Sequence, residues 1–131
     1  MRPGDRSLRI GVVEGDPGLR HFLERALLHL GHRVTLLNRA ARLPDLVRPG
    51  AFDLLLLDPL PDGPGGCEVL EELYSKDVRT PAVLLATSLP SRSRSRWCMS
   101  ARVTVLLKPF SLNELRAAVG AHRSFPAGPG E

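Results

Sequence analysis

Nearly continuous apolar runs alternate along this chain with stretches in which apolar residues recur every three or four positions. Runs of this length, rich in valine and leucine, are typical of strands that are buried on both faces, as in a parallel sheet. The pattern therefore predicts five strands, at residues 8–13, 33–37, 52–57, 81–86 and 103–107.

Two of the intervening segments carry clear helix signals. Asp16 followed by Pro17 is an N-cap with proline at the first helical position, and Gly31 supplies the stop. The first helix should bury one face, comprising Leu19, Phe22, Leu23, Ala26, Leu27 and Leu30. Ser111 and Glu114 form a capping box for the last helix, with an expected buried face of Leu112, Leu115, Ala118 and Val119.

The remaining segments give weaker signals. A helix over 38–47 is interrupted by Pro44, and the 59–66 loop contains three prolines and three glycines. A third helix should turn Val69, Leu70 and Leu73 inward, and 89–100 must form the fourth crossover. Strands that alternate with helices through right-handed crossovers predict an α/β fold, a doubly wound parallel sheet with helices on both faces. We expect one domain over 1–122 and a Pro/Gly-rich tail or truncated linker over 123–131.

Composition and charge narrow the class of protein. The 131 residues are 43% apolar, enough for one packed core, and no apolar stretch approaches the ~18 residues of a membrane span. The N-terminus has no signal-peptide segment, so we expect a cytoplasmic chain with no membrane contact and reduced cysteines. A net charge of +4 suits an acidic partner, but the charge is scattered except at 91–96 and aromatics are only 5%. Direct nucleic-acid binding by this domain is therefore not expected.

Polar residues stand directly after four of the predicted strands. They are Glu14, Asp58, Thr87 and Lys108. Lys108 is one of only two lysines in the chain, which has 16 arginines. Because the carboxyl ends of parallel strands meet at one edge of the sheet, these side chains should converge there. Acids, a hydroxyl and an ammonium together indicate phosphoryl or metal chemistry.

In this order, the residues resemble the receiver domains of two-component response regulators. The resemblance covers Leu8 to Ala121 and rests on four features. Asp58 ends the third strand, and Gly66 follows eight positions later; Thr87 ends the fourth strand, and Lys108-Pro-Phe ends the fifth, 21 positions after Thr87. The resemblance implies a five-stranded parallel sheet of order 2-1-3-4-5, the flavodoxin-like or CheY-like fold.

The resemblance also implies a role for each site residue. Asp58 would be the phosphoacceptor, taking a phosphoryl group from a histidine kinase or phosphotransferase protein. Lys108 would pair with Asp58 and then with the phosphoryl group, and Thr87 would hydrogen-bond a phosphoryl oxygen. Mg²⁺ would be held by Glu14, Asp58 and the backbone carbonyl of Leu60, and the Lys108–Pro109 peptide should be cis.

As a family member, the chain would not be an enzyme beyond self-phosphoryl transfer and autodephosphorylation. Its output would pass to a downstream effector protein or a linked output domain, and a homodimer is compatible with the family.

The chain departs from the family pattern at several positions. Gly15 stands where the family has a second acid that ligates the metal directly, so Mg²⁺ binding should be weak. Asp16 comes one residue late and is better interpreted as the helix N-cap. Val105 replaces a frequent aromatic, prolines occupy 59 and 61, and arginines alternate with serines over 91–96.

Three functions stay open at this point. The first is a phosphoaccepting switch that depends on Mg²⁺ and Asp58. The second is an atypical pseudo-receiver, a phosphorylation-independent interaction module in which Asp58 mainly neutralises Lys108. The third, an enzyme or flavin or nucleotide binder, is disfavoured because the turn at Glu14–Pro17 is acidic and offers one glycine to a phosphate.

Overall fold

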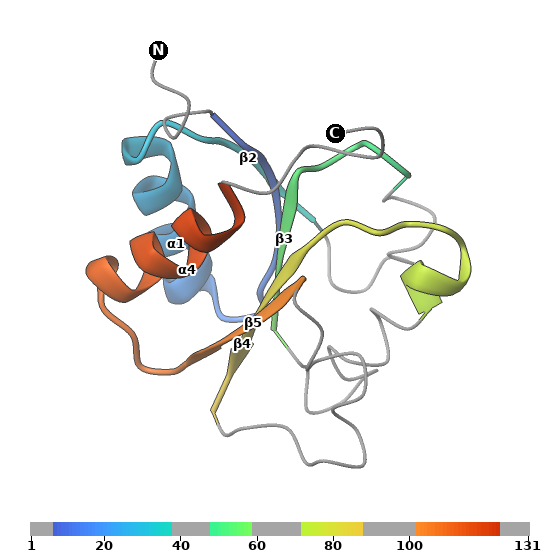
Figure 1. Cartoon of the computed structure of the whole chain (residues 1–131). Helices are drawn as coiled ribbons and strands as arrows, with labels where there is room; N and C mark the ends of the chain where they lie inside the picture. Colours follow the sequence, from blue (N-terminus) through green and yellow to red (C-terminus); the bar gives the residue numbers. More distant parts are fainter. Residues whose placement is uncertain (1–6, 38–47, 59–71, 88–101, 124–131) are drawn as a thin grey trace.

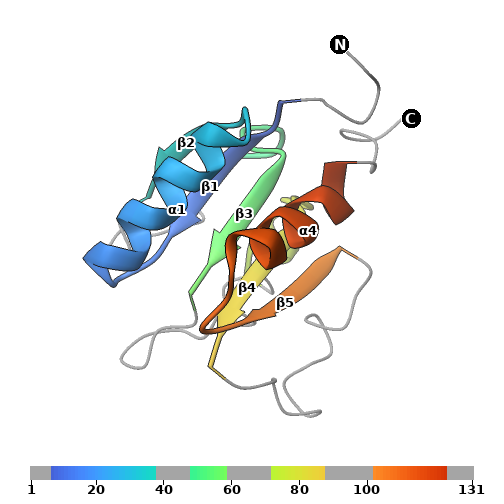
Figure 2. The ribbon, with the colours of Figure 1, turned by 90° about the vertical axis from the view of Figure 1, so that its left-hand side faces the viewer.

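The computed structural model describes residues 7–37, 48–58, 72–87 and 102–123. These ranges contain five strands: β1 (Arg9–Val13), β2 (Arg33–Leu36), β3 (Leu54–Leu57), β4 (Ala82–Ala86) and β5 (Val103–Leu107). All neighbouring pairs are parallel and the order is β2-β1-β3-β4-β5. Figure 1 shows the whole chain, and Figure 2 shows the five strands in this order. The fold and strand order expected from the sequence are therefore confirmed.

Helical segments lie on both faces of the sheet (Figure 1). Helices α1 (Pro17–His29) and α4 (Leu112–Arg123) lie side by side on one face, as seen in Figure 2. A helical turn at 72–75 lies on the opposite face, where Leu73 and Tyr74 are buried. Leu73 thus points inward as predicted.

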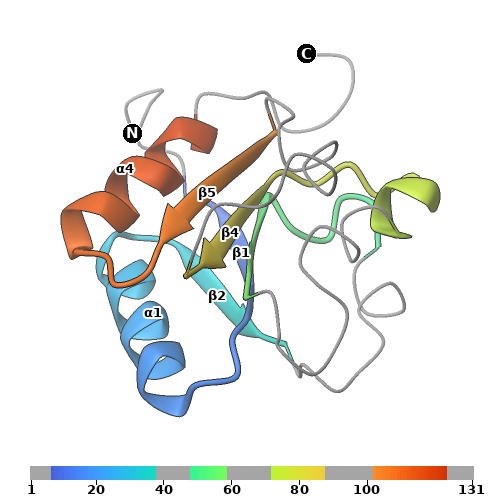
Figure 3. The same cartoon turned by 90° about the horizontal axis from the view of Figure 1, so that it is seen from below.

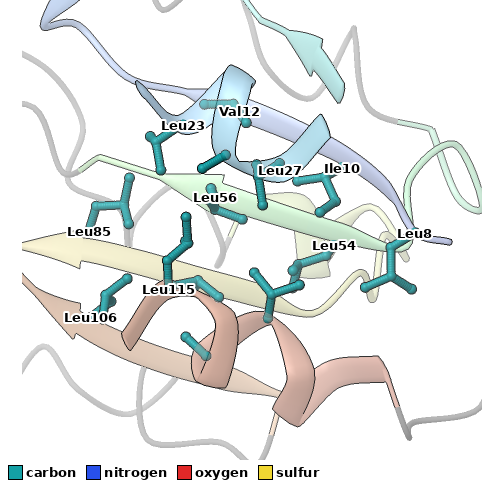
Figure 4. Packing of buried hydrophobic residues seen from close by; sticks show 14 residues of the cluster. Leu8, Ile10, Val12, Leu23, Leu27, Leu54, Leu56, Leu85, Leu106 and Leu115 are labelled. Carbon is teal, nitrogen blue, oxygen red and sulfur yellow. The ribbon is translucent and has the colours of Figure 1, made fainter. Parts of the chain in front are cut away.

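The apolar side chains of the central strands divide between two cores. On the α1 and α4 side, a cluster that includes Ile10, Leu23, Leu56 and Leu115 is almost fully buried (Figure 4). On the other side, alternate strand residues such as Leu55 pack with the 72–78 segment. Because both faces of β3 and β4 are buried, these strands need apolar residues at every position, which explains the continuous runs in the sequence.

Local polar contacts fix the ends of the two helices. The Asp16 side chain accepts a hydrogen bond from the Leu19 backbone at 2.8 Å, which makes Asp16 the N-cap of α1. Gly31, with φ of +93°, reverses the chain after α1. Ser111 and Glu114 exchange side chain-to-backbone hydrogen bonds of 3.0 and 3.1 Å before α4. All three signals are confirmed.

Two details of the sequence prediction are wrong. Strand β3 begins at Leu54 rather than residue 52, and Asp53, just before it, accepts hydrogen bonds from the Arg9 backbone and guanidinium through its carboxylate. Phe22 and Leu112, predicted to be buried, are 38% and 36% exposed. Phe22 meets Phe110 of the loop after β5, with ring centroids 6.3 Å apart, rather than a strand of the sheet.

Several predicted segments lie outside the described residues. These are the helix at 38–47, the loop at 59–66 with Leu60, the positions of Val69 and Leu70, the crossover at 89–100 and the tail from 124. Within the described ranges, no helix is both long enough and apolar enough to cross a membrane.

Candidate functional site

Four polar residues follow directly on the strands at one edge of the sheet. Glu14 follows β1, Asp58 follows β3, Thr87 follows β4 and Lys108 follows β5. Figure 3, seen from below, looks onto this edge. Two ladder hydrogen bonds extend just past the strands, from Asp58 N–H to Val13 O at 2.9 Å and from Lys108 N–H to Ala86 O at 2.8 Å. The sheet itself therefore holds Asp58 and Lys108 in position.

The Lys108 ammonium joins the two acids. Its Nζ donates a hydrogen bond to Asp58 Oδ1 at 3.1 Å and forms an ion pair with Glu14 Oε1, also at 3.1 Å. Since β3 and β4 separate β1 from β5, the lysine side chain extends past the end of β4 to reach both carboxylates. The predicted convergence of these three side chains is confirmed. The Lys108–Pro109 peptide is cis, as the resemblance implied.

Glu14 is the buried member of the site. Its side chain is only 1% exposed, and its Oε2 accepts a hydrogen bond from the Asp16 backbone at 3.0 Å. Its Oε1 makes no hydrogen bond, so the ion pair with Lys108 is what compensates the charge on that oxygen. A buried carboxylate is costly unless it is paired, so Glu14 depends strongly on Lys108. The sequence did not predict this contact, since Lys108 was expected to pair with Asp58 alone.

Asp58 and Lys108 lie closer to solvent. Their side chains are 14% and 22% exposed, so the Asp58 carboxylate is in partial contact with solvent. Partial burial alone would lower the pKa of Lys108, but the hydrogen bond to Asp58 and the negative charges of Glu14 and Asp58 outweigh it. The net result is a pKa above the usual 10.5, so Lys108 stays positively charged at neutral pH.

The other predicted residues take separate positions at this edge. Thr87 is exposed directly after β4, the strand between Asp58 and Lys108. Val105, where the family often has an aromatic, is partly buried and packs against the core on the 72–78 side. Leu60 lies outside the described residues.

Of the three metal ligands that the resemblance implies, Glu14 and Asp58 lie at this edge, and the Leu60 carbonyl lies outside the described residues. Gly15 supplies no ligand, and Asp16 turns its carboxylate to the start of α1. Each of the two remaining acids has one oxygen within 3.1 Å of an ammonium. Within the described ranges, no three His, Cys, Asp or Glu side chains group so as to hold a metal ion. The donor set thus has two carboxylates and a resident cation, which does not fit a three-acid Mg²⁺ site.

Comparisons with known proteins point to one family. A family model described as response regulator receiver domain matches residues 10–120. The transcriptional regulatory protein TcrA of Mycobacterium tuberculosis is 32% identical over 114 residues, which cover 87% of this chain and 45% of TcrA. The transcriptional activator PfeR of Pseudomonas aeruginosa is 34% identical over 115 residues, which cover 88% of this chain and 37% of PfeR. The chain thus spans less than half the length of either.

Solved structures agree on the fold. A structure of histidine kinase ThkA in complex with response regulator TrrA contains a chain that matches with a TM-score of 0.72 and 28% identity, over 87% of this chain and 97% of that one. The chemotaxis protein CheY4 of Vibrio cholerae matches with a TM-score of 0.69 and 17% identity, again over 87% and 97% of the two chains.

Proposed function

This chain belongs to the response regulator receiver domain family, and on that premise we propose that it accepts a phosphoryl group on Asp58. The observation that carries the proposal is the hydrogen bond of 3.1 Å between Lys108 Nζ and Asp58 Oδ1 at the carboxyl edge of the sheet. This hydrogen bond holds a positive charge next to a partly exposed carboxylate. A carboxylate that accepts an anionic group needs such a charge nearby, because the charge offsets the repulsion between the two anions.

In the proposed reaction, a carboxylate oxygen of Asp58 attacks the phosphorus of a phosphohistidine on a donor protein. An O–P bond forms, the N–P bond breaks, and the electron pair of that bond returns to the donor's imidazole ring. Lys108 offsets the negative charge of the incoming phosphoryl oxygens. Thr87, exposed at the same edge, supplies a hydroxyl that can donate a hydrogen bond to one of those oxygens.

The proposed partners are a histidine kinase or phosphotransferase as donor, and an effector protein or a linked output domain as target. The match to a response regulator solved with a histidine kinase supports the donor class. The greater length of TcrA and PfeR supports a linked output domain. We propose that the receiver domain ends at residue 122. We also propose that the protein acts in the cytoplasm.

A second function, the pseudo-receiver, is favoured by one specific observation. Lys108 is shared between Asp58 and the buried Glu14, and Gly15 leaves the site without a third acid. In that case Asp58 is a structural counter-ion, and the fold acts as a binding module that is independent of phosphorylation.

An intact-mass assay with acetyl phosphate distinguishes the two functions. Wild type, Asp58→Asn and the control Asp77→Asn are each incubated with and without Mg²⁺. Asp77 is a suitable control because its side chain is 92% exposed and its positive φ of 63° is one that asparagine tolerates. We expect one phosphoryl adduct on wild type and Asp77→Asn, and none on Asp58→Asn, with unchanged circular dichroism. An adduct on Asp58→Asn would refute the acceptor assignment, and no adduct on wild type either with or without Mg²⁺ would favour the pseudo-receiver.

A further inference from the structure

We propose that the Lys108 ammonium is the resident counter-cation of the Glu14–Asp58 pair, so that a divalent cation binds appreciably only when Lys108 is removed or a third acid is added. The inference concerns the same site as the proposed function. It does not require that Asp58 accept a phosphoryl group, so the two proposals can fail separately.

The first step is the geometry of the two acids. Glu14 Oε1 and Asp58 Oδ1 each lie 3.1 Å from the same nitrogen atom. The two oxygens are therefore separated by no more than twice that distance. Lys108 Nζ is in contact with both oxygens, so a metal ion that binds these same two oxygens must compete with it.

The second step is the balance of charge. Two carboxylates and one ammonium leave a net charge of −1 at the site. Asp16 directs its carboxylate to the start of α1, where Oδ2 accepts the Leu19 N–H at 2.8 Å, rather than to Lys108. A divalent cation thus meets one surplus negative charge together with a lysine that repels it.

The third step is the dependence of Glu14 on a cation. Glu14 is 1% exposed and Oε1 has no hydrogen bond, so removing the lysine leaves a buried negative charge uncompensated. Such a chain should be destabilised and should recover when Mg²⁺ replaces the lost ammonium. Wild type, in which the ammonium is already present, should respond little.

The test is thermal unfolding of the whole chain in EDTA and in about 10 mM MgCl₂, with ionic strength matched by NaCl. The variants are Lys108→Met and, as a matched control, Lys76→Met. Lys76 is the other lysine of the chain and is exposed. We expect Tm of wild type and Lys76→Met to change by less than about 1 °C, whereas Lys108→Met melts lower in EDTA and gains about 5 °C with Mg²⁺. A gain in wild type equal to that of Lys108→Met, or no gain in Lys108→Met, would overturn the proposal.

A second variant keeps the proposal testable if Lys108→Met does not fold. Gly15→Asp adds a carboxylate with Lys108 in place, and Gly15 is not among the described glycines with positive φ. Gly120→Asp is the control, because it makes the same change of charge at an exposed position with no atom within 4 Å of the new Cβ. By calorimetry, Gly15→Asp should bind Mg²⁺ at least about tenfold more tightly than wild type or Gly120→Asp. Equal affinity in all three proteins, or a wild-type Kd below about 0.1 mM, would refute the idea that Lys108 fills the cation position.

Discussion

Acid should destabilise this domain through His122, a buried histidine on α4. Its side chain is 3% exposed, and its Nε2 lies 2.9 Å from the Thr104 hydroxyl of β5. Burial lowers the pKa of His122 below the usual 6.5, because the charged imidazolium is poorly solvated inside the protein. The ring therefore stays neutral in the folded chain at a pH at which the unfolded chain already binds a proton.

The sign and size of the effect follow from this difference in proton binding. Below pH 6.5 the unfolded state binds more protons than the folded state. The free energy of unfolding therefore decreases as the pH is lowered from 6.5 to the pKa of His122 in the folded chain. Above pH 6.5 His122 is neutral in both the folded and the unfolded state, so the free energy of unfolding no longer changes with pH through this residue. Between pH 7.5 and 5.5 one such group removes at most about 1.4 kcal/mol, which corresponds to about 5 °C in Tm for a domain of this size.

Urea unfolding monitored by circular dichroism at several pH values measures this loss. His122→Gln retains hydrogen-bonding groups but does not titrate, so its stability should fall less between pH 7.5 and 5.5 than that of wild type. His29→Gln is the control, because His29 is the last residue of α1 and is exposed. The slopes with pH are compared rather than the absolute stabilities, since any replacement of His122 also changes packing. If His122→Gln and His29→Gln show the same slope, the buried imidazole is not the source of acid sensitivity.

Three further predictions concern stability, and each is measured by urea unfolding at neutral pH. Leu56→Ala should lower the free energy of unfolding by about 3 kcal/mol, because Leu56 of β3 is fully buried under the helices. Leu28→Ala, at a site that is 53% exposed, should lower it by less than about 0.5 kcal/mol. Equal losses would contradict the packing described for α1 and β3. Asp16→Ala should cost about 1 kcal/mol by removing the N-cap bond to Leu19, and Asp16→Ser should recover most of it; no recovery would mean that the cap is not the cause. Gly31→Ala should lower the free energy of unfolding by roughly 1–2 kcal/mol. The cause would be the φ of +93° alone, since no atom lies within 4 Å of the added Cβ. An unchanged urea midpoint would exclude that backbone strain.

Much of the fold could be predicted from the sequence because its determinants are local or periodic. The caps at Asp16 and at Ser111 with Glu114 connect residues three positions apart, so the chain carries the whole signal in a few letters. The strands could be recognised because burial on both faces demands apolar residues at every position. Helix faces were predicted less accurately. Phe22 follows the apolar period of α1, yet it is 38% exposed, since its neighbour is a loop residue that the period does not reveal.

The candidate site divides in the same way. The sequence determined that Glu14, Asp58, Thr87 and Lys108 meet at one edge, because parallel strands bring their carboxyl ends together whatever the details of packing. Only the tertiary structure decided that Lys108 pairs with both acids and that Glu14 depends on it. The reason is that electrostatic pairing depends on separations of a few ångströms and on the burial of each oxygen. Those quantities arise from side chains on strands far apart in the chain, and no spacing in the sequence encodes them.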